Sequence, residues 1–264
     1  MRLPDFNYTK LIRSMILDTI VEQKKEEVSL LKRNGILLPD PFVGKTPDKS
    51  RGFKQALLDY KGVSIIAEVK KASPSKGVIC PDFDPVKIAK NYQSHGAQAL
   101  SVLTDVNFFQ GSLLYLMQVR NVVDLPVLRK DFIIDRLQID EAFAHGADAI
   151  LLIASILDEQ QIRDFQQHAA ALGMDSLVEV HQEKELSKSL AAGAELIGIN
   201  NRNLNDFSVD INTTFRLMKL IPPHIPVVSE SGLRNIQDIE ALTKAGATAA
   251  LIGETLMRAG EKSG

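Results

Sequence analysis

The chain has one cysteine, no tryptophan and no long hydrophobic run among its 264 residues. With Cys80 alone, no intrachain disulfide can form, and no CxxC zinc or redox motif is present. The most apolar stretch, 149–157, is about half as long as a membrane-spanning helix must be. Residues 1–10 lack the apolar segment of a signal peptide. These absences favour a cytoplasmic protein, and we expect no membrane partner.

Side chains of the two charge signs are nearly balanced. The 31 lysines and arginines and 33 aspartates and glutamates leave a formal charge of −2, so we expect no nucleic-acid partner. Apolar residues make up 45% and charged residues 24% of the chain, close to average globular usage. This composition excludes a disordered, collagen-like or coiled-coil chain. The five histidines show no metal-ligand spacing, so no metal site is expected.

The strongest pattern is a Gly-Ala pair that follows a helix-like segment and precedes an apolar run. It occurs four times, with glycines at Gly96, Gly146, Gly193 and Gly246, which are 50, 47 and 53 residues apart. Glycine ends helices readily because it adopts the left-handed conformation without steric cost. The apolar runs do not alternate with polar residues, which is typical of parallel strands buried on both faces.

Each period is too long for one strand and one helix, so a second strand is expected between repeats. These strands are predicted at 63–69, 126–128, 176–180 and 225–229, and helices at 85–94, 135–144, 159–172, 182–191 and 235–244. Eight alternating units predict an α/β protein, a single-domain (β/α)8 TIM barrel within residues 1–264. The rival is an open doubly wound sheet. That fold usually has a Gly-rich turn after its first strand, where this chain has Glu-Val-Lys.

Residues 1–60 precede the barrel and are expected to form an N-terminal helical extension packed on it. Residues 8–32 form an amphipathic helical pattern with Ile12, Ile16 and Ile20 on one stripe, and 53–58 marks a second short helix. Two placements remain open at this point. The extension can cap the bottom of the barrel or form a partial lid over its top.

Reactive residues of this fold lie at the carboxyl ends of strands and in the loops that follow. Charged or amide side chains occupy these positions at Glu68, Lys70, Lys130, Glu179 and Asn200. Buried ions cost several kcal/mol each unless they are paired or used, and a purely structural barrel core would hold Val, Ile and Leu. The alternative to a catalytic mouth is a Lys-Glu network that only stabilises the barrel.

The loops after the last two strands carry a different signal. Ser231–Gly232 and Gly253–Glu254 place small residues where backbone N–H groups can converge on an anion, each before a helix-like segment. These loops are the usual phosphate site of the fold. Either glycine can also be an ordinary turn former.

Other loop residues are candidate substrate contacts. The turn at 73–77, which begins with Ser73, can close over a substrate or lie on the surface. Phe108 and Phe109 can form a wall for a flat ring or pack on the barrel. Arg202 can clamp a carboxylate in a two-pronged contact or be a surface charge. His181 is the one histidine expected near the mouth, behind the residues that touch substrate.

These segments also match a known family when they are taken together. The most specific segment is 66–77, which reads IAEVKKASPSKG. Further matches are 101–105, 108–112, 128–132, 177–181, 197–204, 229–232 and 251–254, with 20–24 and 51–53 before the barrel. Over nearly its whole length, the chain resembles the indole-3-glycerol phosphate synthase family of tryptophan biosynthesis, in its single-function form.

The resemblance implies a carboxy-lyase that needs no cofactor or metal. Its substrate would be 1-(2-carboxyphenylamino)-1-deoxyribulose 5-phosphate, and its products indole-3-glycerol phosphate, CO2 and water. Lys130 would be the general acid of ring closure, with a pKa lowered toward neutrality by a neighbouring lysine. Glu179 and Glu68 would be acid/base residues of the later steps, and Lys70 would bind substrate or donate a proton.

The resemblance also implies the substrate contacts. Asn200, Arg202 and Ser73 would contact the carboxylate and hydroxyls, and Glu230 would meet a hydroxyl or orient a lysine. The backbone of Ser231–Gly232 and Gly253–Glu254 would hold the phosphate. Apart from this small phosphorylated substrate we expect no partner, and the chain is expected to be a monomer, with a weak dimer as the alternative.

Two other functions remain open. One is a phosphate-binding barrel isomerase such as phosphoribosylanthranilate isomerase, for which a single acid/base pair suffices. The other is a non-catalytic phosphometabolite-binding protein, which would keep the glycines but would not require Lys130 and Glu179.

Overall fold

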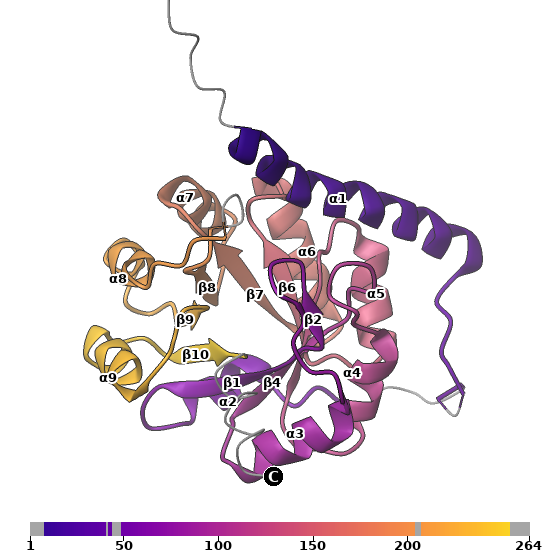
Figure 1. Cartoon of the computed structure of the whole chain (residues 1–264), viewed down its shortest axis with the longest axis horizontal. Helices are drawn as coiled ribbons and strands as arrows, with labels where there is room; N and C mark the ends of the chain where they lie inside the picture. The colour runs from indigo at the N-terminus through magenta and orange to yellow at the C-terminus, as the bar shows by residue number, and fades with distance from the viewer. Residues whose placement is uncertain (1–7, 41, 44–48, 204–206, 254–264) are drawn as a thin grey trace, which may run out of the picture.

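Eight parallel strands close into a barrel in the computed structural model, which describes residues 8–40, 42–43, 49–203 and 207–253 (Figure 1). Its side chains are described from residue 16 onward. The order around the barrel is β1-β10-β9-β8-β7-β6-β5-β4, and β4 pairs with β1 to close the ring. The strands are β1 (Ser64–Val69), β4 (Ala99–Leu103), β5 (Val127–Lys130), β6 (Ala149–Ile153), β7 (Asp175–Val180), β8 (Ile197–Asn200), β9 (Val227–Glu230) and β10 (Ala249–Ile252). The predicted (β/α)8 barrel is confirmed.

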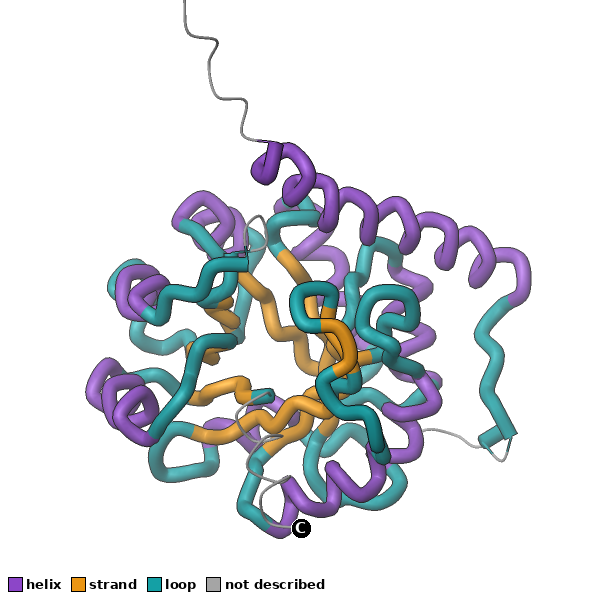
Figure 2. Tube along the Cα trace, viewed as in Figure 1, coloured by secondary structure: helices purple, strands orange, loops and turns teal. Residues whose placement is uncertain are grey.

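Helices surround this ring of strands (Figure 2). They are α3 (Pro85–Ser94), α4 (Leu113–Arg120), α5 (Arg136–Ala144), α6 (Glu159–Ala171), α7 (Glu183–Ala191), α8 (Asn212–Met218) and α9 (Ile236–Ala245). Side-chain caps fix where several of them begin, as at α5 and α6, where Asp135 and Asp158 each form a capping box with a glutamine. The four repeat glycines follow helices with φ between 79° and 82°, as the sequence pattern predicted.

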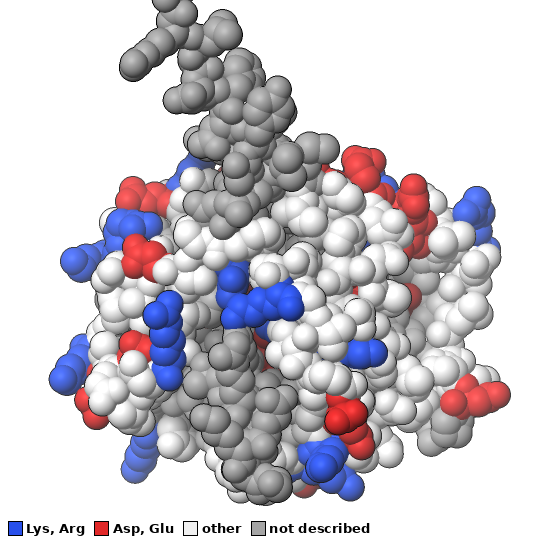
Figure 3. All heavy atoms as spheres, viewed as in Figure 1, with Lys and Arg blue, Asp and Glu red and all other residues white. Residues whose placement is uncertain are grey.

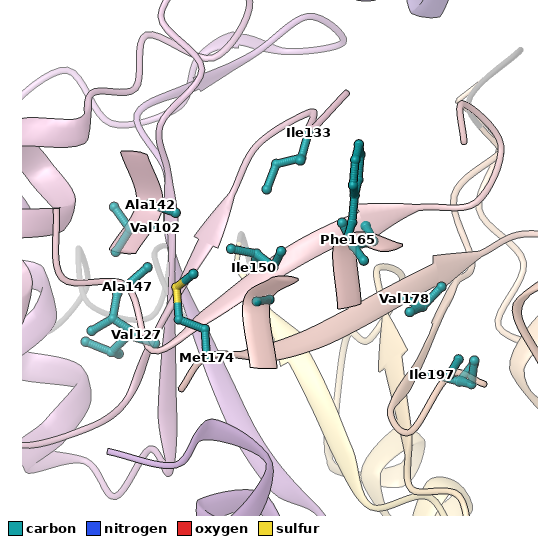
Figure 4. Packing of buried hydrophobic residues seen from close by; sticks show 14 of the residues in the cluster. Val102, Val127, Ile133, Ala142, Ala147, Ile150, Phe165, Met174, Val178 and Ile197 are labelled. Atoms are coloured by element: carbon teal, nitrogen blue, oxygen red, sulfur yellow. The ribbon is translucent and has the colours of Figure 1, made fainter. Parts of the chain in front are cut away.

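Alternation along each strand separates two apolar layers. Ala67, Val69 and their counterparts on other strands face outward and pack against the helices; Figure 4 shows part of this layer around Ile150 and Val178. Ile66 and its counterparts fill the lower barrel interior. Towards the carboxyl ends of the strands the inward positions become polar, and the interior opens into a cavity.

The N-terminal helices lie at opposite ends of the barrel. In α1 (Tyr8–Asn34), the Lys24 Nζ atom is 2.8 Å from Asp105 Oδ2 and 2.8 Å from Asp131 Oδ1, just beyond the ends of β4 and β5. In α2 (Phe53–Leu58), Phe53 and Leu57 are buried among the lower interior residues. The two placements left open by the sequence therefore both occur, since α1 lies at the mouth and α2 closes the bottom.

A short hairpin follows β1. Strands β2 (Ala72–Ser73) and β3 (Gly77–Val78) pair in antiparallel fashion, and the backbone N–H groups of Ile79 and Cys80 both donate to the Lys71 carbonyl. The turn predicted at 73–77 is the tip of this hairpin. Ser73, Pro74, Ser75 and Lys76 line the cavity beside it, so the hairpin borders the mouth.

Candidate active site

A cavity of about 720 Å³ lies at the carboxyl ends of the barrel strands, within the usual size range of small-molecule sites. Twelve of the fourteen residues predicted from the sequence line it: Glu68, Lys70, Ser73, Phe109, Lys130, Glu179, Asn200, Arg202, Glu230, Ser231, Gly232 and Gly253. Phe108 is not among its lining residues. Glu254 lies outside the described residues. On the face drawn in Figure 3, basic side chains gather near the centre, above the barrel.

Lys130 reaches from β5 to carboxylates on two other strands. Its Nζ atom is 2.8 Å from Glu179 Oε2 on β7 and 2.7 Å from Glu230 Oε2 on β9. In the order around the barrel, β5 and β9 are diametrically opposite, so this contact spans the interior. Both glutamates are almost fully buried, and the Lys130 side chain is 13% exposed. A protonated amine is thus held inside the cavity by two carboxylates.

The electrostatics of this cluster differ from the sequence-based expectation for Lys130. Burial alone would lower the pKa of Lys130, but Glu179, Glu230 and Glu68 raise it above its ordinary value. The expectation of a lowered pKa was wrong because the side chains around Lys130 are carboxylates, and the second lysine is paired elsewhere. Lys130 is therefore a charged hydrogen-bond donor at neutral pH.

The pKa values of Glu179 and Glu230 shift in opposite directions. Burial raises the pKa of Glu230 to about 7, with Lys130 opposing the shift and the charges of Glu179 and Glu68 adding to it. For Glu179, burial also favours the protonated form, but Lys130, His181 and a hydrogen bond with Asn200 lower its pKa. At neutral pH Glu179 is thus ionised, whereas Glu230 is close to half-protonated. This arrangement is suited to acid/base chemistry.

Glu68 of β1 and Lys70, which follows this strand, form their own ion pair; residues two positions apart in an extended chain lie on the same side. In this pair Glu68 compensates the charge of Lys70, the second lysine at the mouth of the barrel. The pair lies beside Gly253, where an added Cβ would come within 2.6 Å of Glu68 Oε2. Gly198 likewise leaves room for Glu230, since a Cβ there would lie 2.2 Å from Glu230 Oε1. These glycines allow large carboxylates to lie inside a narrow barrel.

Aromatic and aliphatic side chains form one wall of the cavity. The Phe109 and Phe132 rings, which follow β4 and β5, lie 6.1 Å apart between centroids with planes 36° apart. Ile16, Leu17 and Ile20 of α1 line the same cavity. Phe132 and the α1 residues were not predicted as site residues, because only the fold places them beside Phe109.

The opposite side of the cavity is suited to an anion. Ser231 and Gly232 follow β9 with φ of 66° and 84°, and the Asn201 side-chain amide donates to the Ser231 carbonyl at 3.0 Å. Arg234, which follows this loop, and Arg202 after β8 also line the cavity. Arg234 was also not predicted, since an exposed arginine at the start of a helix carries no distinctive sequence signal.

A buried charge cluster supports the apolar wall. Lys24 of α1 is 1% exposed and contacts Asp105, Asp131 and, at 2.8 Å, Glu27. Asp131 is also 3.2 Å from Arg129 Nη2, and these partners lower its pKa although burial opposes them. Because Asp131 directly follows Lys130, this cluster joins α1 to the strand that carries the central lysine.

The described residues contain neither a metal-binding cluster nor a membrane-spanning helix. No group of three or more His, Cys, Asp or Glu in that part of the chain is arranged to hold a metal ion. No helix there is long and apolar enough to span a membrane.

Comparison with known proteins identifies the family. The sequence model of indole-3-glycerol phosphate synthase matches residues 17–263. The chain belongs to the indole-3-glycerol phosphate synthase family. A relative of that name from Desulfotalea psychrophila is 64% identical over 247 residues, covering 94% of this chain and 95% of the relative. Another, from Chlorobium phaeovibrioides, is 51% identical over 246 residues, covering 93% and 95%. The chain is therefore an enzyme of this family.

A solved structure gives a more distant match. The N-acetylmannosamine-6-phosphate 2-epimerase of Clostridium perfringens has a TM-score of 0.58 and 15% sequence identity, covering 76% of this chain and 90% of that protein. At this identity the likeness shows the barrel fold alone.

Proposed function

We propose that the protein is an indole-3-glycerol phosphate synthase. It converts 1-(2-carboxyphenylamino)-1-deoxyribulose 5-phosphate to indole-3-glycerol phosphate and releases CO2 and water, which makes it a carboxy-lyase. The observation that carries the proposal is the Lys130 ammonium group, held inside the cavity between Glu179 and Glu230. Family membership supports the same reaction.

The site chemistry suits the first step, ring closure. The ring carbon that bears the carboxylate attacks the substrate carbonyl, and the carbonyl oxygen must take up a proton. Lys130 is charged and donates that proton as negative charge develops on the oxygen. Its raised pKa does not prevent the transfer, because an alkoxide is more basic than an amine. Loss of CO2 then restores the aromatic ring.

The later steps need one group to remove a proton and another to protonate the departing hydroxyl. Glu179 is ionised and serves as the base, while Lys70, paired with Glu68, donates to the leaving water. Glu230 orients Lys130 through Oε2. Its buried Oε1 has no hydrogen-bond partner among the described residues and can accept from a substrate hydroxyl.

Binding separates the two ends of the substrate. The backbone at Ser231–Gly232 and Gly253, assisted by Arg234, holds the phosphate. Phe109 and Phe132 contact the flat ring on the opposite side. Arg202, Asn200 and Ser73 contact the benzoate carboxylate and hydroxyls. This arrangement stretches the substrate across the row formed by Glu179, Lys130 and Glu230.

The assembly and compartment are also proposals. We propose that residues 1–264 form one domain that acts as a monomer in the cytoplasm. The support is that one chain supplies both charged and apolar walls of the cavity, and that Cys80 is the only cysteine. Light scattering after size exclusion should give a mass near 29.1 kDa, and a mass of twice that value would show a dimer.

The reaction is tested directly with purified protein. Incubation with the carboxyphenylamino deoxyribulose phosphate should produce indole fluorescence and release CO2 in equal amounts. Parallel incubation with phosphoribosylanthranilate should give no isomerised product. Turnover of the second compound alone would indicate an isomerase, and binding of either without turnover would indicate a binding protein.

A further inference from the structure

His181 lies between two carboxylates at the end of β7. Its Nδ1 atom is 3.2 Å from Glu185 Oε2 on α7, and its Nε2 atom is 3.4 Å from Glu179 Oε1. Glu179 uses its other oxygen, Oε2, to accept from Lys130. The side chains of Glu185, His181, Glu179, Lys130 and Glu230 therefore form a continuous row from α7 into the cavity.

The ring orientation constrains where a proton lies. Nδ1 donates to Glu185 Oε2, because a carboxylate at this distance accepts. In the neutral ring Nε2 then carries a lone pair facing another acceptor, Glu179 Oε1. The His181 side chain is 13% exposed and Glu179 is 3% exposed, so water screens this repulsion poorly. A proton on Nε2 converts the repulsion into an attraction, and the row then alternates in charge.

We infer that His181 is a positioning residue that acts through Glu179, keeping this carboxylate ionised and turned toward Lys130. The catalytic consequence rests on the proposed function, whereas the contact between His181 and Glu179 does not. His181 is absent from the residues that line the cavity.

The surrounding charges favour the cationic ring. Glu179 on β7, Glu185 on α7 and Glu230 on β9 raise the pKa of His181, although its burial works in the opposite direction. The cation of the cluster, Lys130 on β5, is separated from His181 by Glu179, with which it pairs. Glu68 on β1 adds negative charge beside Lys130 and Glu230.

Glu185 also has a structural role. Its Oε2 accepts the His181 backbone N–H at 2.7 Å, and its Oε1 accepts from the Gln182 side chain at 2.8 Å. Replacing Glu185 would disturb the start of α7 together with the ring. The informative variant is therefore His181→Gln, which removes the titrating ring and keeps the backbone contact.

The first test needs no substrate. Proton NMR of the histidine rings, assigned with His181→Gln, should give His181 a pKa above its ordinary value. In Glu179→Gln that pKa should fall by about one unit or more, the usual effect of losing a nearby opposite charge. The ring of His168, which pairs with Asp140 at 2.7 Å on the outer helices, provides the reference signals. An unchanged His181 titration in Glu179→Gln would overturn the inference.

The second test uses the pH dependence of kcat. Without the cation beside it, Glu179 has a higher pKa, so in His181→Gln the acid limb should move to higher pH by about one to three units. At the optimum kcat should fall about tenfold because the carboxylate is held on one side only, with KM within about twofold. His168→Gln should match the wild type in both respects.

The outcomes separate the two proposals. If the wild-type protein gives no indole product but the pKa of His181 still falls in Glu179→Gln, the proposed function is wrong. The interaction between His181 and Glu179 is then still supported. If the wild type is active and His181→Gln keeps the wild-type pH profile, the inference fails and the function stands. A variant that only loses thermal stability, with an unmoved acid limb, would also count against His181 as a positioning residue.

Discussion

Lys130 shows why a barrel interior can hold charges that a structural core would exclude. Its ammonium group contacts two buried carboxylates, and such burial is costly unless each ion is compensated. Gly198 makes the space that Glu230 occupies. At the top of the barrel, titratable side chains held in fixed positions therefore take the place of apolar packing.

The protonation of Glu230 should affect how the free energy of unfolding depends on pH. Its pKa is raised to about 7 in the folded protein, against 4.5 for the ordinary side chain. As pH rises between these values, the unfolded chain ionises and the folded one does not, so Glu230 makes the wild type progressively less stable. The Glu230→Gln variant does not lose stability in this way, because its side chain does not titrate. The difference in unfolding free energy, variant minus wild type, should therefore rise by about 3 kcal/mol from pH 4.5 to 7 and then level off.

Urea unfolding of both proteins at closely spaced pH values measures this difference. Titrating groups that do not interact with Glu230 cancel, because they are common to both chains. A stability difference that does not change with pH over this interval would show that Glu230 is ionised in the folded protein, and its pKa would then not be raised.

The variant Gly232→Val tests the proposal that the loop after β9 binds the phosphate. The φ of Gly232 is +84°, and an added Cβ would lie 2.5 Å from Val209 Cγ1, so Gly232→Val must displace the loop. KM should rise about tenfold or more, a loss of about 1.4 kcal/mol or more in binding, with kcat less affected. Gly96→Val is the control, since Gly96 has a φ of +80° and no atom within 4 Å of an added Cβ. Equal KM values for both variants would refute the phosphate assignment.

Residues that line the cavity were predictable where strand alternation and strand ends decide the direction of a side chain. Glu68, Lys130 and Glu179 are cases of this kind. The direction of the Lys130 pKa was not predictable, because it depends on which charges from distant strands lie nearest. Phe132 and Arg234 were missed for a similar reason: their types are common in loops, and only the assembled barrel brings them to the cavity.

At the scale of elements, α1 and α2 have different tasks. Phe53 and Leu57 of α2 fill the bottom of the barrel, whereas α1 brings Ile16, Leu17 and Ile20 to the cavity. Lys24 attaches α1 at the mouth through Asp105 and Asp131. We therefore expect α1 to affect both stability and substrate binding.

Lys24→Met should leave two buried aspartates with less compensation. Loss of one partner from a buried ion pair costs about 3–5 kcal/mol, and a displaced α1 should also raise KM. Lys25→Met is the matched control, because Lys25 is the next residue and its pair with Glu22 is exposed; its effect should stay within about 0.5 kcal/mol. Urea unfolding measures the stability of the two variants, and substrate kinetics measure their KM. Similar behaviour of the two variants would contradict this role of Lys24.

Most elements were predictable because their signals are local. The helix at 85–94 was predicted with the observed ends, where Asp84 caps the helix and Pro85 opens it. The helices α4 and α8 were not predicted individually. They are short, and α8 has no side-chain cap. The placement of α1 and α2 depended on contacts such as Lys24 with Asp131, which no local pattern contains.

At the scale of the whole molecule, the closed ring accounts for the distribution of the site residues. The strands β5 and β9 stand opposite each other, so an apolar wall near β5 faces the Ser231–Gly232 loop after β9. Residues about 100 positions apart in the chain, such as Lys130 and Glu230, thereby meet. The repeat pattern predicted this ring, and the ring predicted that strand-end residues would converge.

Turnover of Lys130→Ala with the carboxyphenylamino deoxyribulose phosphate decides whether this lysine is the acid. We expect turnover to fall by about 10²–10⁴-fold, the range for a general acid, with phosphate binding retained. Lys54→Ala, which removes the ion pair between this residue of α2 and the exposed Glu195, should keep wild-type turnover. Near-normal turnover of Lys130→Ala would contradict the central claim that this lysine supplies the proton for ring closure.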